Sequence, residues 1–399
     1  MNPVVIVGAG PVGCAAALYL ATNDIPVILL EGHDSLPRDL RASTFHPPTL
    51  DMLDELSLTE DMIAQGLIVP NYQYRDRRTG EVADFKLERL EGETRHPYRL
   101  QCEQFKMTGL TVERLSKMPN VEVRFGVRVT GFRDTHDGVG VLTYSEADGE
   151  QRIPASYLIG ADGADSAIRR ASGTLFEGMT YPERFLVVST TFRFEDHFEN
   201  LAWVNYVSDP DEWCVLLKTR DLWRMLVPTP IDQRAERFLT DDYIEERLQR
   251  IVPQDQPYDI AHRTLYRVHQ RVAERYRVDR HVLLAGDAAH INNPLGGMGM
   301  NGGVHDAINL AEKLVMILKE AKNSDELLDQ YERQRRGICV KFVQEHTKKN
   351  KALMEATDTE IQKRRQAEFM RASSDPELER QFLMRTSMID AVRESYEIA

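Results

Sequence analysis

The chain has 399 residues, of which 42% are hydrophobic and 28% are charged, and its formal net charge is −13. This length suggests about two domains, and the negative charge argues against nucleic-acid binding and against a polybasic membrane anchor. No apolar run approaches the roughly 20 residues needed to span a bilayer. The sequence leaves no room for a signal peptide before the first strand, and its four cysteines form no CxxC pair. These features predict a cytoplasmic protein with reduced thiols and no metal site.

The first elements follow a strand-helix-strand pattern that is typical of dinucleotide-binding folds. Residues 4–7 are an apolar strand, a helix is expected over 11–23, and a second apolar strand covers 27–30 and ends at Glu31. A carboxylate at this position, about 20 residues after the glycine motif, can hold the hydroxyl groups of a ribose.

The motif Gly8-Ala9-Gly10-Pro11-Val12-Gly13 lies between the first strand and the helix. Gly8 permits a tight turn, Gly10 lets a pyrophosphate approach the backbone, and Gly13 lets the helix pack on the sheet. The helix then begins with Pro11 and Val12, and its N-terminus faces the phosphates. The motif therefore predicts a bound dinucleotide.

The middle of the chain predicts hairpins and a mostly antiparallel sheet. After a loop and a leucine-rich helix, residues 68–100 have the pattern of a hairpin, 104–118 that of a helix, and 121–129 that of one strand. A further hairpin is expected around Asp148-Gly149, with arms over 139–144 and 152–159. Four strand-like runs with all three tryptophans follow, at 185–194, 203–207, 213–217 and 223–227.

A second glycine motif follows the apolar residues 157–159. It contains Asp162 and Gly163, and Arg169 closes it. Taken alone, this segment is equally consistent with an ordinary turn at a strand end.

The most informative motif lies downstream, where the apolar strand 281–285 ends at Gly286-Asp287. A loop rich in proline and glycine follows, a helix is expected to begin near Gly302, and the chain is then largely helical to its end. Asp287 can accept hydrogen bonds from a polyol. Backbone at Gly297 and Gly299 can approach a flat ring, and the amides of Met300 and Asn301 can stabilise negative charge on that ring. Binding of NAD requires only one glycine-rich helix N-terminus, such as the one after residues 8–13. A longer ligand that is held at both of its ends requires a second, and the segment after Gly286 would provide it.

In this order, the three motifs resemble those of the class A FAD-dependent aromatic monooxygenases, the family of para-hydroxybenzoate and phenol hydroxylases. The resemblance implies an α/β fold with a Rossmann-like FAD-binding domain, an inserted substrate domain with a mostly antiparallel sheet, and C-terminal helices. The expected division assigns 1–71, 101–175 and 268–330 to the FAD-binding domain, 72–100 and 176–267 to the substrate domain, and 331–399 to a C-terminal helical region.

The resemblance also implies roles for individual residues. Glu31 would hold the adenosine ribose and Arg41 would approach the FAD pyrophosphate. Gln104 would contact the flavin, with Gln101 as its rival. The Asp162-Gly163 motif with Arg169 would serve both FAD and NAD(P)H. Gly286 and Asp287 would bind the ribitol, and Pro294 would lie beside the flavin ring where oxygen reacts. Asn293 and Met298 depart from the usual family residues, which leaves the adjoining pocket wall undetermined.

The implied activity is hydroxylation of a small phenolic or heteroaromatic substrate. NADPH or NADH would reduce the FAD, and reaction with O2 would give a flavin C4a-hydroperoxide that transfers one oxygen atom. His46 is a candidate catalytic residue because an unperturbed imidazole changes its charge near neutral pH, although a role at the start of a helix before Pro47 competes with this interpretation. Tyr206 is another candidate and competes with a core role. Trp213, Arg220 and Arg224 are further candidates for the wall of the ring pocket.

Three alternatives remain open. The first is a flavoprotein of the same fold with a non-hydroxylating outcome, an epoxidase or a reductase; a halogenase is disfavoured because Trp203 does not begin a WxWxIP motif. A plain NAD dehydrogenase would leave residues 284–303 unexplained, and a non-catalytic flavin-binding protein would not oxidise NAD(P)H. The long C-terminal helices leave room for a homodimer. The substrate, the hydroxylated position, the choice of NADH or NADPH and any catalytic base are not determined by the sequence.

Overall fold

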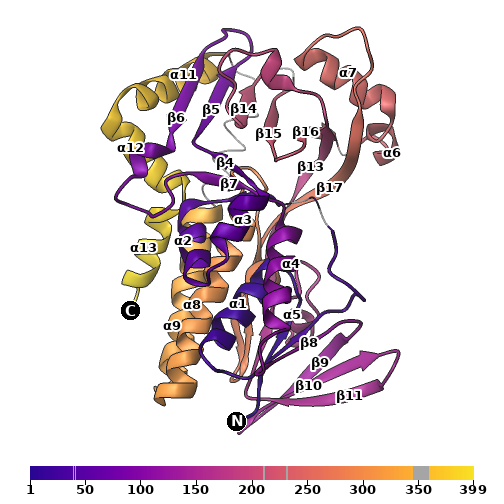
Figure 1. Cartoon of the computed structure of the whole chain (residues 1–399), viewed down its shortest axis with the longest axis vertical. Coiled ribbons are helices and arrows are strands. Elements are labelled where there is room, and N and C mark those ends of the chain that lie inside the picture. Colours follow the sequence, from indigo (N-terminus) through magenta and orange to yellow (C-terminus); the bar gives the residue numbers. More distant parts are fainter. Residues whose placement is uncertain (39, 41, 210–211, 231, 345–358) are drawn as a thin grey trace.

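The computed structural model describes residues 1–38, 40, 42–209, 212–230, 232–344 and 359–399. A Rossmann-like α/β body forms one end of the molecule, a broad sheet covers its other end, and C-terminal helices run along one side (Figure 1). Among the described residues, no helix combines the length and the apolar character needed to cross a bilayer.

The α/β body is built on a mostly parallel sheet. The β1, β2, β8, β12 and β19 strands are parallel, and β18 is an antiparallel edge. From edge to edge, the strands are β18 (Arg277–Asp279), β19 (Val282–Leu284), β12 (Tyr157–Gly160), β1 (Val4–Val7), β2 (Val27–Leu30) and β8 (Val121–Arg124). The strand β1 is buried along its whole length, as expected for a central strand covered on both faces.

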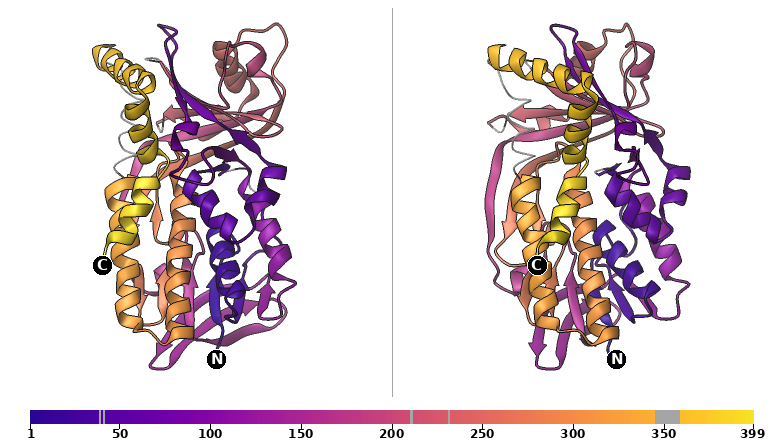
Figure 2. Two further views of the ribbon diagram at one scale, coloured as in Figure 1. Left: turned by 60° about the vertical axis from the view of Figure 1, so that its left-hand side comes forward. Right: turned by 90° about the vertical axis from the view of Figure 1, so that its left-hand side faces the viewer.

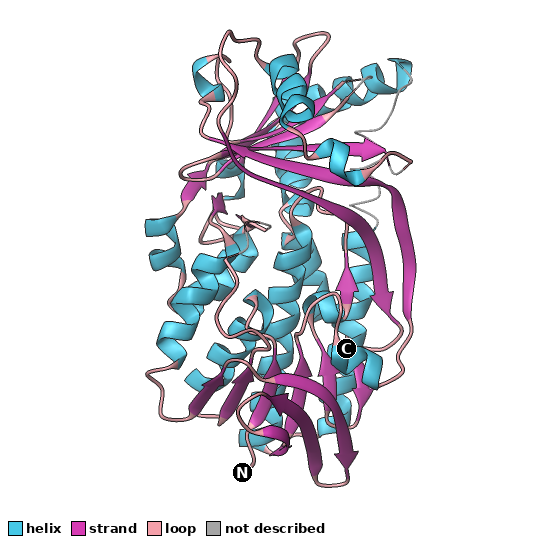
Figure 3. Ribbon diagram, turned by 90° about the vertical axis from the view of Figure 1, so that its right-hand side faces the viewer, coloured by secondary structure: helices cyan, strands magenta, loops and turns pink. Residues whose placement is uncertain are grey.

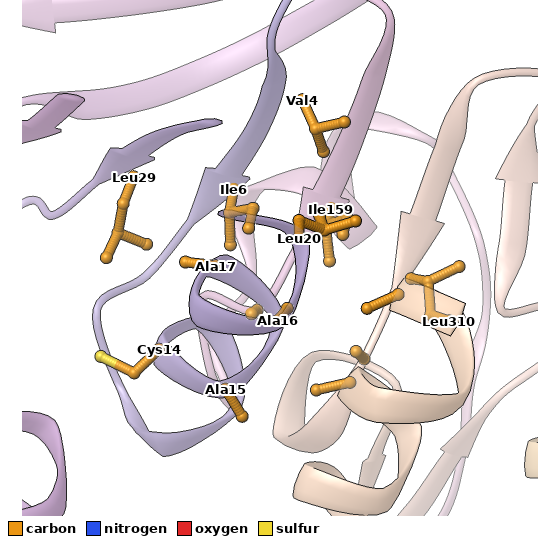
Figure 4. Packing of buried hydrophobic residues seen from close by; sticks show 14 of the residues in the cluster. Val4, Ile6, Cys14, Ala15, Ala16, Ala17, Leu20, Leu29, Ile159 and Leu310 are labelled. Atoms are coloured by element: carbon orange, nitrogen blue, oxygen red, sulfur yellow. The ribbon is translucent and has the colours of Figure 1, made fainter. Parts of the chain in front are cut away.

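Two helices, α1 (Pro11–Thr22) and α8 (Met298–Glu320), pack on each other beside this sheet. Figure 4 shows small side chains of α1, among them Ala16 and Ala17, between Ile6 and Ile159 of the sheet and Leu310 of α8. Small residues let the two helices approach closely, so the motifs at their N-terminal ends come together. The α8 helix begins at Met298 and not near Gly302, because the positive φ angles of Gly296 and Gly297 already turn the chain into it.

The two segments predicted as single strands at 121–129 and 152–159 are each divided. The first contains β8 and the beginning of β9 (Arg128–Thr135), separated by Gly126 with φ +68°. The second contains β11 (Gly149–Ala155) and β12, which belong to different sheets. With β10 (Gly138–Ser145), β9 and β11 form a three-stranded antiparallel sheet.

The broad sheet has eight strands, and two of them are long and curved (Figure 3). In order, its strands are β20 (His290–Ile291), β17 (Ile260–Ala273), β13 (Phe176–Thr190), β16 (Trp223–Pro230), β15 (Cys214–Lys218), β14 (Val204–Ser208), β5 (Asn71–Asp76) and β6 (Val82–Lys86). All of its pairings are antiparallel except that of β14 with β5. The sheet therefore joins an early hairpin to the middle of the chain, and β20 connects it to the downstream glycine loop.

A small sheet at the junction of the two regions has the order β3 (Thr44–Phe45), β7 (Arg99–Gln101) and β4 (Leu67–Val69). At the C-terminus, α13 (Ile389–Glu397) packs on α9 (Ser324–Ile338), and α12 (Pro376–Thr386) packs on the strand β6 and on the following short helix η1 (Leu87–Leu90) (Figure 2). The remaining helical elements are α2 (Pro47–Glu55), α3 (Thr59–Gln65), α4 (Gln104–Leu115), α5 (Ala167–Ala171), η2 (Phe194–Asp196), α6 (Ala235–Phe238), α7 (Asp241–Ile251), η3 (Gly286–Ala288), η4 (Cys339–Gln344) and α11 (Thr359–Ser374).

Candidate functional site

The first glycine motif combines two crowded positions with one open position. A Cβ atom at Gly8, where φ is +101°, would lie 2.4 Å from the Ala161 carbonyl oxygen, and one at Gly13 would lie 1.9 Å from the Gly8 carbonyl oxygen. A Cβ atom at Gly10 would meet nothing within 4 Å. The α1 helix starts at Pro11 without a side-chain cap, so its first amides face this open space. This geometry fits the approach of a pyrophosphate.

Glu31 lies directly beside the same turn, at the carboxyl end of β2. Its Oε2 accepts a hydrogen bond from the Ala9 amide at 2.9 Å, and its Oε1 accepts one from the His33 amide at 3.0 Å. The carboxylate thus holds the glycine turn in place, and the predicted ribose contact would add to that role.

The second motif connects to the third through Arg169. Asp162 Oδ2 accepts hydrogen bonds from the amides of Ala167 and Ile168, at 2.7 and 3.2 Å, at the start of α5. The Arg169 guanidinium lies over the ring of Phe176 and donates to the Ala288 carbonyl at 2.8 Å. Gly163 has φ +77° and open space in front of it. The contacts of Asp162 and Arg169 join the two motifs, whereas their predicted contacts with cofactors stay predictions.

The third motif packs against the first. A Cβ atom at Gly303 would lie 2.7 Å from Val12 Cγ2 and 3.0 Å from the Cα atom of Gly286. Gly286 has φ +62°, and Asp287, the next residue, is exposed in η3. The three motifs therefore meet in space, as a ligand held at both ends requires.

The loop before α8 is held in place by Asn301. Its Nδ2 donates to the carbonyl oxygens of Thr44 at 2.8 Å and Gly297 at 2.6 Å, and its Oδ1 accepts from the His46 amide at 2.9 Å. The α8 helix has no side-chain cap at Gly297, and Gly299 in its first turn faces open space. These first-turn amides, with that of Met300, are suitably placed for a flat, electron-poor ring.

His46 is fully buried and immediately precedes α2. Its Nε2 lies 2.9 Å from the carbonyl oxygen of Gly296. The imidazole thus contacts the backbone of the loop that contains Pro294, which is half-buried. These contacts favour a positioning role over the candidate catalytic role, and the catalytic role stays a prediction.

The two glutamines that compete for the flavin contact have different surroundings. Gln101 is fully buried, its Oε1 accepts from the hydroxyls of Ser43 and Thr44, and its Nε2 donates to Thr44 Oγ1. Gln104 is half-buried at the first position of α4. Because the Gln101 side chain is already hydrogen-bonded to Ser43 and Thr44, Gln104 is the better candidate for the contact with the cofactor. Arg41 lies outside the described residues.

A buried ionic network supports the third motif from behind. Asp306 in α8 accepts a hydrogen bond from the Gly286 amide at 3.1 Å and pairs with His290 Nε2 at 2.8 Å and Arg335 Nε at 2.7 Å. Burial alone would raise the pKa of the Asp306 carboxyl, but the charges of His290 and Arg335 outweigh burial and lower it to about 2. Burial alone would lower the pKa of His290, yet the Cys339 and Asp306 side chains raise it well above its ordinary value. The charges are therefore permanent near neutral pH.

His305, one residue before Asp306, behaves differently. Burial, followed by the positive charge of Arg335, lowers the pKa of its imidazole to about 3. The ring stays neutral and shares a hydrogen bond of 2.8 Å with the Thr49 hydroxyl. His305 therefore has a structural contact and carries no charge toward the site at neutral pH.

Leu295, in the loop before α8, belongs to a buried cluster that includes residues of the broad sheet. The same cluster contains Tyr206 of β14 and Trp213, which directly precedes β15. The Tyr206 ring stacks on that of Tyr74 with centroids 4.9 Å apart. Tyr206 is thus part of an aromatic layer in the cluster that includes Leu295, and its catalytic role stays a prediction.

The two arginines considered for the ring pocket have different partners and different exposure. Arg224 is buried and pairs with Glu103 at 3.4 Å, while Arg220 is exposed and donates to the Ala64 carbonyl at 2.6 Å. Sequence reasoning did not identify the partnership of Asp306 and Arg335, which are 29 residues apart on different helices. No local motif indicates that pair, because only the packing of α8 against α9 brings the two residues together.

Comparison with known proteins gives a consistent result. A family model described as an FAD binding domain matches residues 1–346. The chain is 34% identical over 96% of its length to para-nitrophenol 4-monooxygenase of Pseudomonas sp. (strain WBC-3), covering 95% of that protein. It is 33% identical over 85% of its length to 6-hydroxy-3-succinoylpyridine 3-monooxygenase of Pseudomonas putida (strain DSM 28022 / S16), covering 86% of it. The crystal structure of p-nitrophenol 4-monooxygenase from Pseudomonas putida DLL-E4 superimposes with a TM-score of 0.91 at 32% identity and 98% coverage of both chains.

Proposed function

Because the chain belongs to the FAD-binding family and is an FAD-dependent aromatic monooxygenase, we propose that it hydroxylates a small phenolic or hydroxylated heteroaromatic ring with NAD(P)H and O2. The named relatives act on a nitrophenol and on a hydroxypyridine. The proposal extends what these substrates share, a single aromatic ring with a hydroxyl group, to this chain.

One observation carries the proposal. Leu295, in the loop that would adjoin the flavin ring, belongs to the buried cluster that contains Tyr206 of the sheet and Trp213, which directly precedes β15. A cluster rich in aromatic side chains that includes a residue of that loop suits a flat ring, which prefers offset or edge-to-face contacts with aromatic side chains. The same cluster limits the access of water.

We assign the cofactor contacts as follows. The open glycines and the uncapped helix starts fit FAD at both of its ends, and Asp287 is exposed where the ribitol would pass. The residues proposed to hold FAD are Gly8, Gly10, Pro11, Val12, Gly13, Glu31, Arg41, Gln104, Asp162, Gly163, Arg169, Gly286, Asp287, Pro294, Gly297, Gly299, Met300 and Asn301. When bound, FAD supplies the redox chemistry and the activation of oxygen.

The protein's own residues orient and enclose the reacting groups. Asn301 and His46 hold the loop beside the ring, and the first-turn amides of α8 face the place where negative charge would collect. For a phenolic substrate, a hydrogen-bond partner near the hydroxyl would assist loss of its proton. Tyr206 is the candidate for this role, and replacement by phenylalanine would test it while preserving the aromatic stack.

The decisive experiment measures NADH and NADPH oxidation by the FAD-loaded protein with a panel of phenols, hydroxybenzoates and hydroxypyridines. We expect one or more compounds to accelerate oxidation and to gain one oxygen atom by mass analysis. A protein that retains FAD but stays at the background rate with every compound would contradict the proposal. The rates with the two nucleotides also decide which one is the reductant.

Three further assignments are proposals of the same kind. The division into FAD-binding, substrate and C-terminal regions at 71/72, 100/101, 175/176, 267/268 and 330/331 would be tested by limited proteolysis. The cytoplasmic location would be tested by cell fractionation, and a homodimer by light scattering of the FAD-loaded protein.

A further inference from the structure

Among the residues that the structure describes, Arg99 is a buried cation without a counter-ion. It is the first residue of β7 and only 2% exposed. Its Nε and Nη1 have no hydrogen-bond partner in the described part of the chain, and no carboxylate there forms an ion pair with it.

The other buried arginines show how unusual this is. Arg335 pairs with Asp306, Arg224 pairs with Glu103, and Arg169 donates to two backbone carbonyls. Each of them has acceptors provided by the fold. Removing a guanidinium from water without such acceptors is costly, so an anionic ligand that supplied them would offset that cost.

The surroundings of Arg99 compensate its charge only in part. The guanidinium carbon lies 4.0 Å from the centroid of the Tyr72 ring, which is a favourable cation–π distance. The Tyr72 hydroxyl is itself engaged with Thr386 Oγ1 at 2.8 Å. The ring face attracts the cation but accepts no hydrogen bond from its N–H groups in the guanidinium plane. These groups therefore still need an acceptor.

Arg99 also lies where a substrate would be expected. Successive side chains of a strand alternate between its faces, so Arg99 and Gln101 project from the same face of β7. Gln101 binds Thr44, whose carbonyl oxygen accepts a hydrogen bond from Asn301 at the start of α8. On the other side, Tyr72 belongs to the cluster that contains Leu295 and Tyr206. The short strand β7 thus runs from the Tyr72 ring, at Arg99, to the residues that hold the loop before α8, at Gln101.

We propose that Arg99 binds an anionic oxygen of the aromatic substrate, either a ring carboxylate or a phenolate. This inference rests on the proposed function, since it names the charge of the ring that the enzyme hydroxylates. The ring would lie between β7 and the loop before α8, with its anionic group toward the guanidinium. Charge-assisted hydrogen bonds to the orphaned N–H groups would then fix which ring carbon faces the flavin. The substrate class is accordingly a phenol with a negative charge, in preference to a neutral ring of the same shape.

The test compares matched anionic and neutral rings on the FAD-loaded protein. The probes are 4-hydroxybenzoate with 4-hydroxybenzamide, and 4-nitrophenol with 4-nitroanisole at a pH where the phenol is ionised. Binding is followed by the change in flavin absorbance, so it does not depend on turnover. The variants are Arg99→Met, which removes the charge, and Arg99→Lys, which keeps it. Arg124→Met serves as the control, because Arg124 is a surface residue of β8 that pairs with Glu122.

We expect the wild-type protein to bind at least one anionic probe about tenfold or more tightly than its neutral partner. Arg99→Met should weaken binding of that anion by about 10- to 100-fold, the range expected for a lost charge-assisted bond, and leave the neutral partner within about threefold. Arg99→Lys should restore part of the preference, and Arg124→Met should match the wild type. FAD content and the melting temperature identify a variant that has not folded, in which case Arg99→Lys decides between the two outcomes.

Equal binding of anionic and neutral probes by the wild type, or equal loss of both in the Arg99 variants, would overturn the inference. The second pattern would mean that Arg99 only packs on Tyr72. Product analysis in parallel separates this failure from failure of the proposed function: hydroxylation of a phenol that is indifferent to Arg99 would leave the function standing. Absence of hydroxylation with every probe would count against the function itself.

Discussion

Replacement of Asp306 by asparagine should destabilise the protein and loosen its hold on FAD. The carboxylate is fully buried and serves three partners at once, the Gly286 amide, His290 and Arg335. The asparagine side chain has nearly the same shape but no charge. It would leave the Arg335 guanidinium, which is 3% exposed, as an uncompensated buried cation.

The magnitude follows from this burial. Removal of one partner from a buried ion pair costs about 3–5 kcal/mol. At about 2 °C per kcal/mol for a large domain, the melting temperature should fall by roughly 6–10 °C. The matched control is Asp329→Asn, which removes the exposed partner of Arg277 at 2.7 Å. A surface ion pair of this kind contributes about 1 kcal/mol or less.

The assay is thermal melting of the FAD-loaded variants together with FAD retention on gel filtration. Because Gly286 begins the third motif, Asp306→Asn should also release FAD more readily than Asp329→Asn. Equal, small shifts in the two variants would refute the reasoning, since they would mean that the buried network contributes no more than a surface pair.

The pH dependence provides an independent check. The folded pKa of His290 is raised well above its ordinary value of 6.5. Its contribution to the free energy of unfolding is therefore fully present below about pH 6.5 and is lost as the pH rises through the folded pKa. The pKa of Asp306 is lowered to about 2, so its contribution is present above its ordinary value of 3.8 and is lost as the pH falls toward 2. The wild type should lose this part of its stability in alkaline solution, and Asp306→Asn should show a much smaller loss over the same range.

Three further changes follow from the site. Gly13→Ala should abolish FAD binding, because the new Cβ would lie 1.9 Å from the Gly8 carbonyl oxygen; Gly109→Ala, in a helix with open space around it, should fold normally and retain FAD, which absorbance at 450 nm would show. Glu31→Gln should weaken FAD binding about tenfold in equilibrium dialysis, because a neutral amide is a poorer acceptor than a carboxylate, and unchanged affinity would argue against the ribose contact. Asn301→Ala removes two bonds to backbone carbonyls and one from a backbone amide; we expect it to lower kcat at least tenfold with FAD still bound, whereas a wild-type kcat would show that the loop is held without it.

The sequence by itself determined the features that depend on local backbone conformation. A glycine motif between an apolar strand and a helix specifies its own turn, and the structure confirmed the strand, the helix and the crowding at Gly8 and Gly13. The family and the FAD cofactor followed from three such motifs in order, and the comparisons confirmed both. Where local signals were ambiguous, boundaries were wrong: 121–129 is not one strand, because a glycine with positive φ separates two strands of different sheets.

Tertiary structure alone decided which side chains meet. The burial of His46 against Gly296 joins residues 250 positions apart, and the pairing of Asp306 with Arg335 depends on how two helices pack. Arg99 carried no signal in the sequence, because an arginine on a short strand is ordinary until its surroundings are known. The period of the hydrophobic residues indicates which face of a helix or strand is buried, but it does not indicate which other element packs on that face. Burial, the neighbouring charge and the missing acceptor give a polar side chain its chemistry, and all three arise only when distant segments pack together.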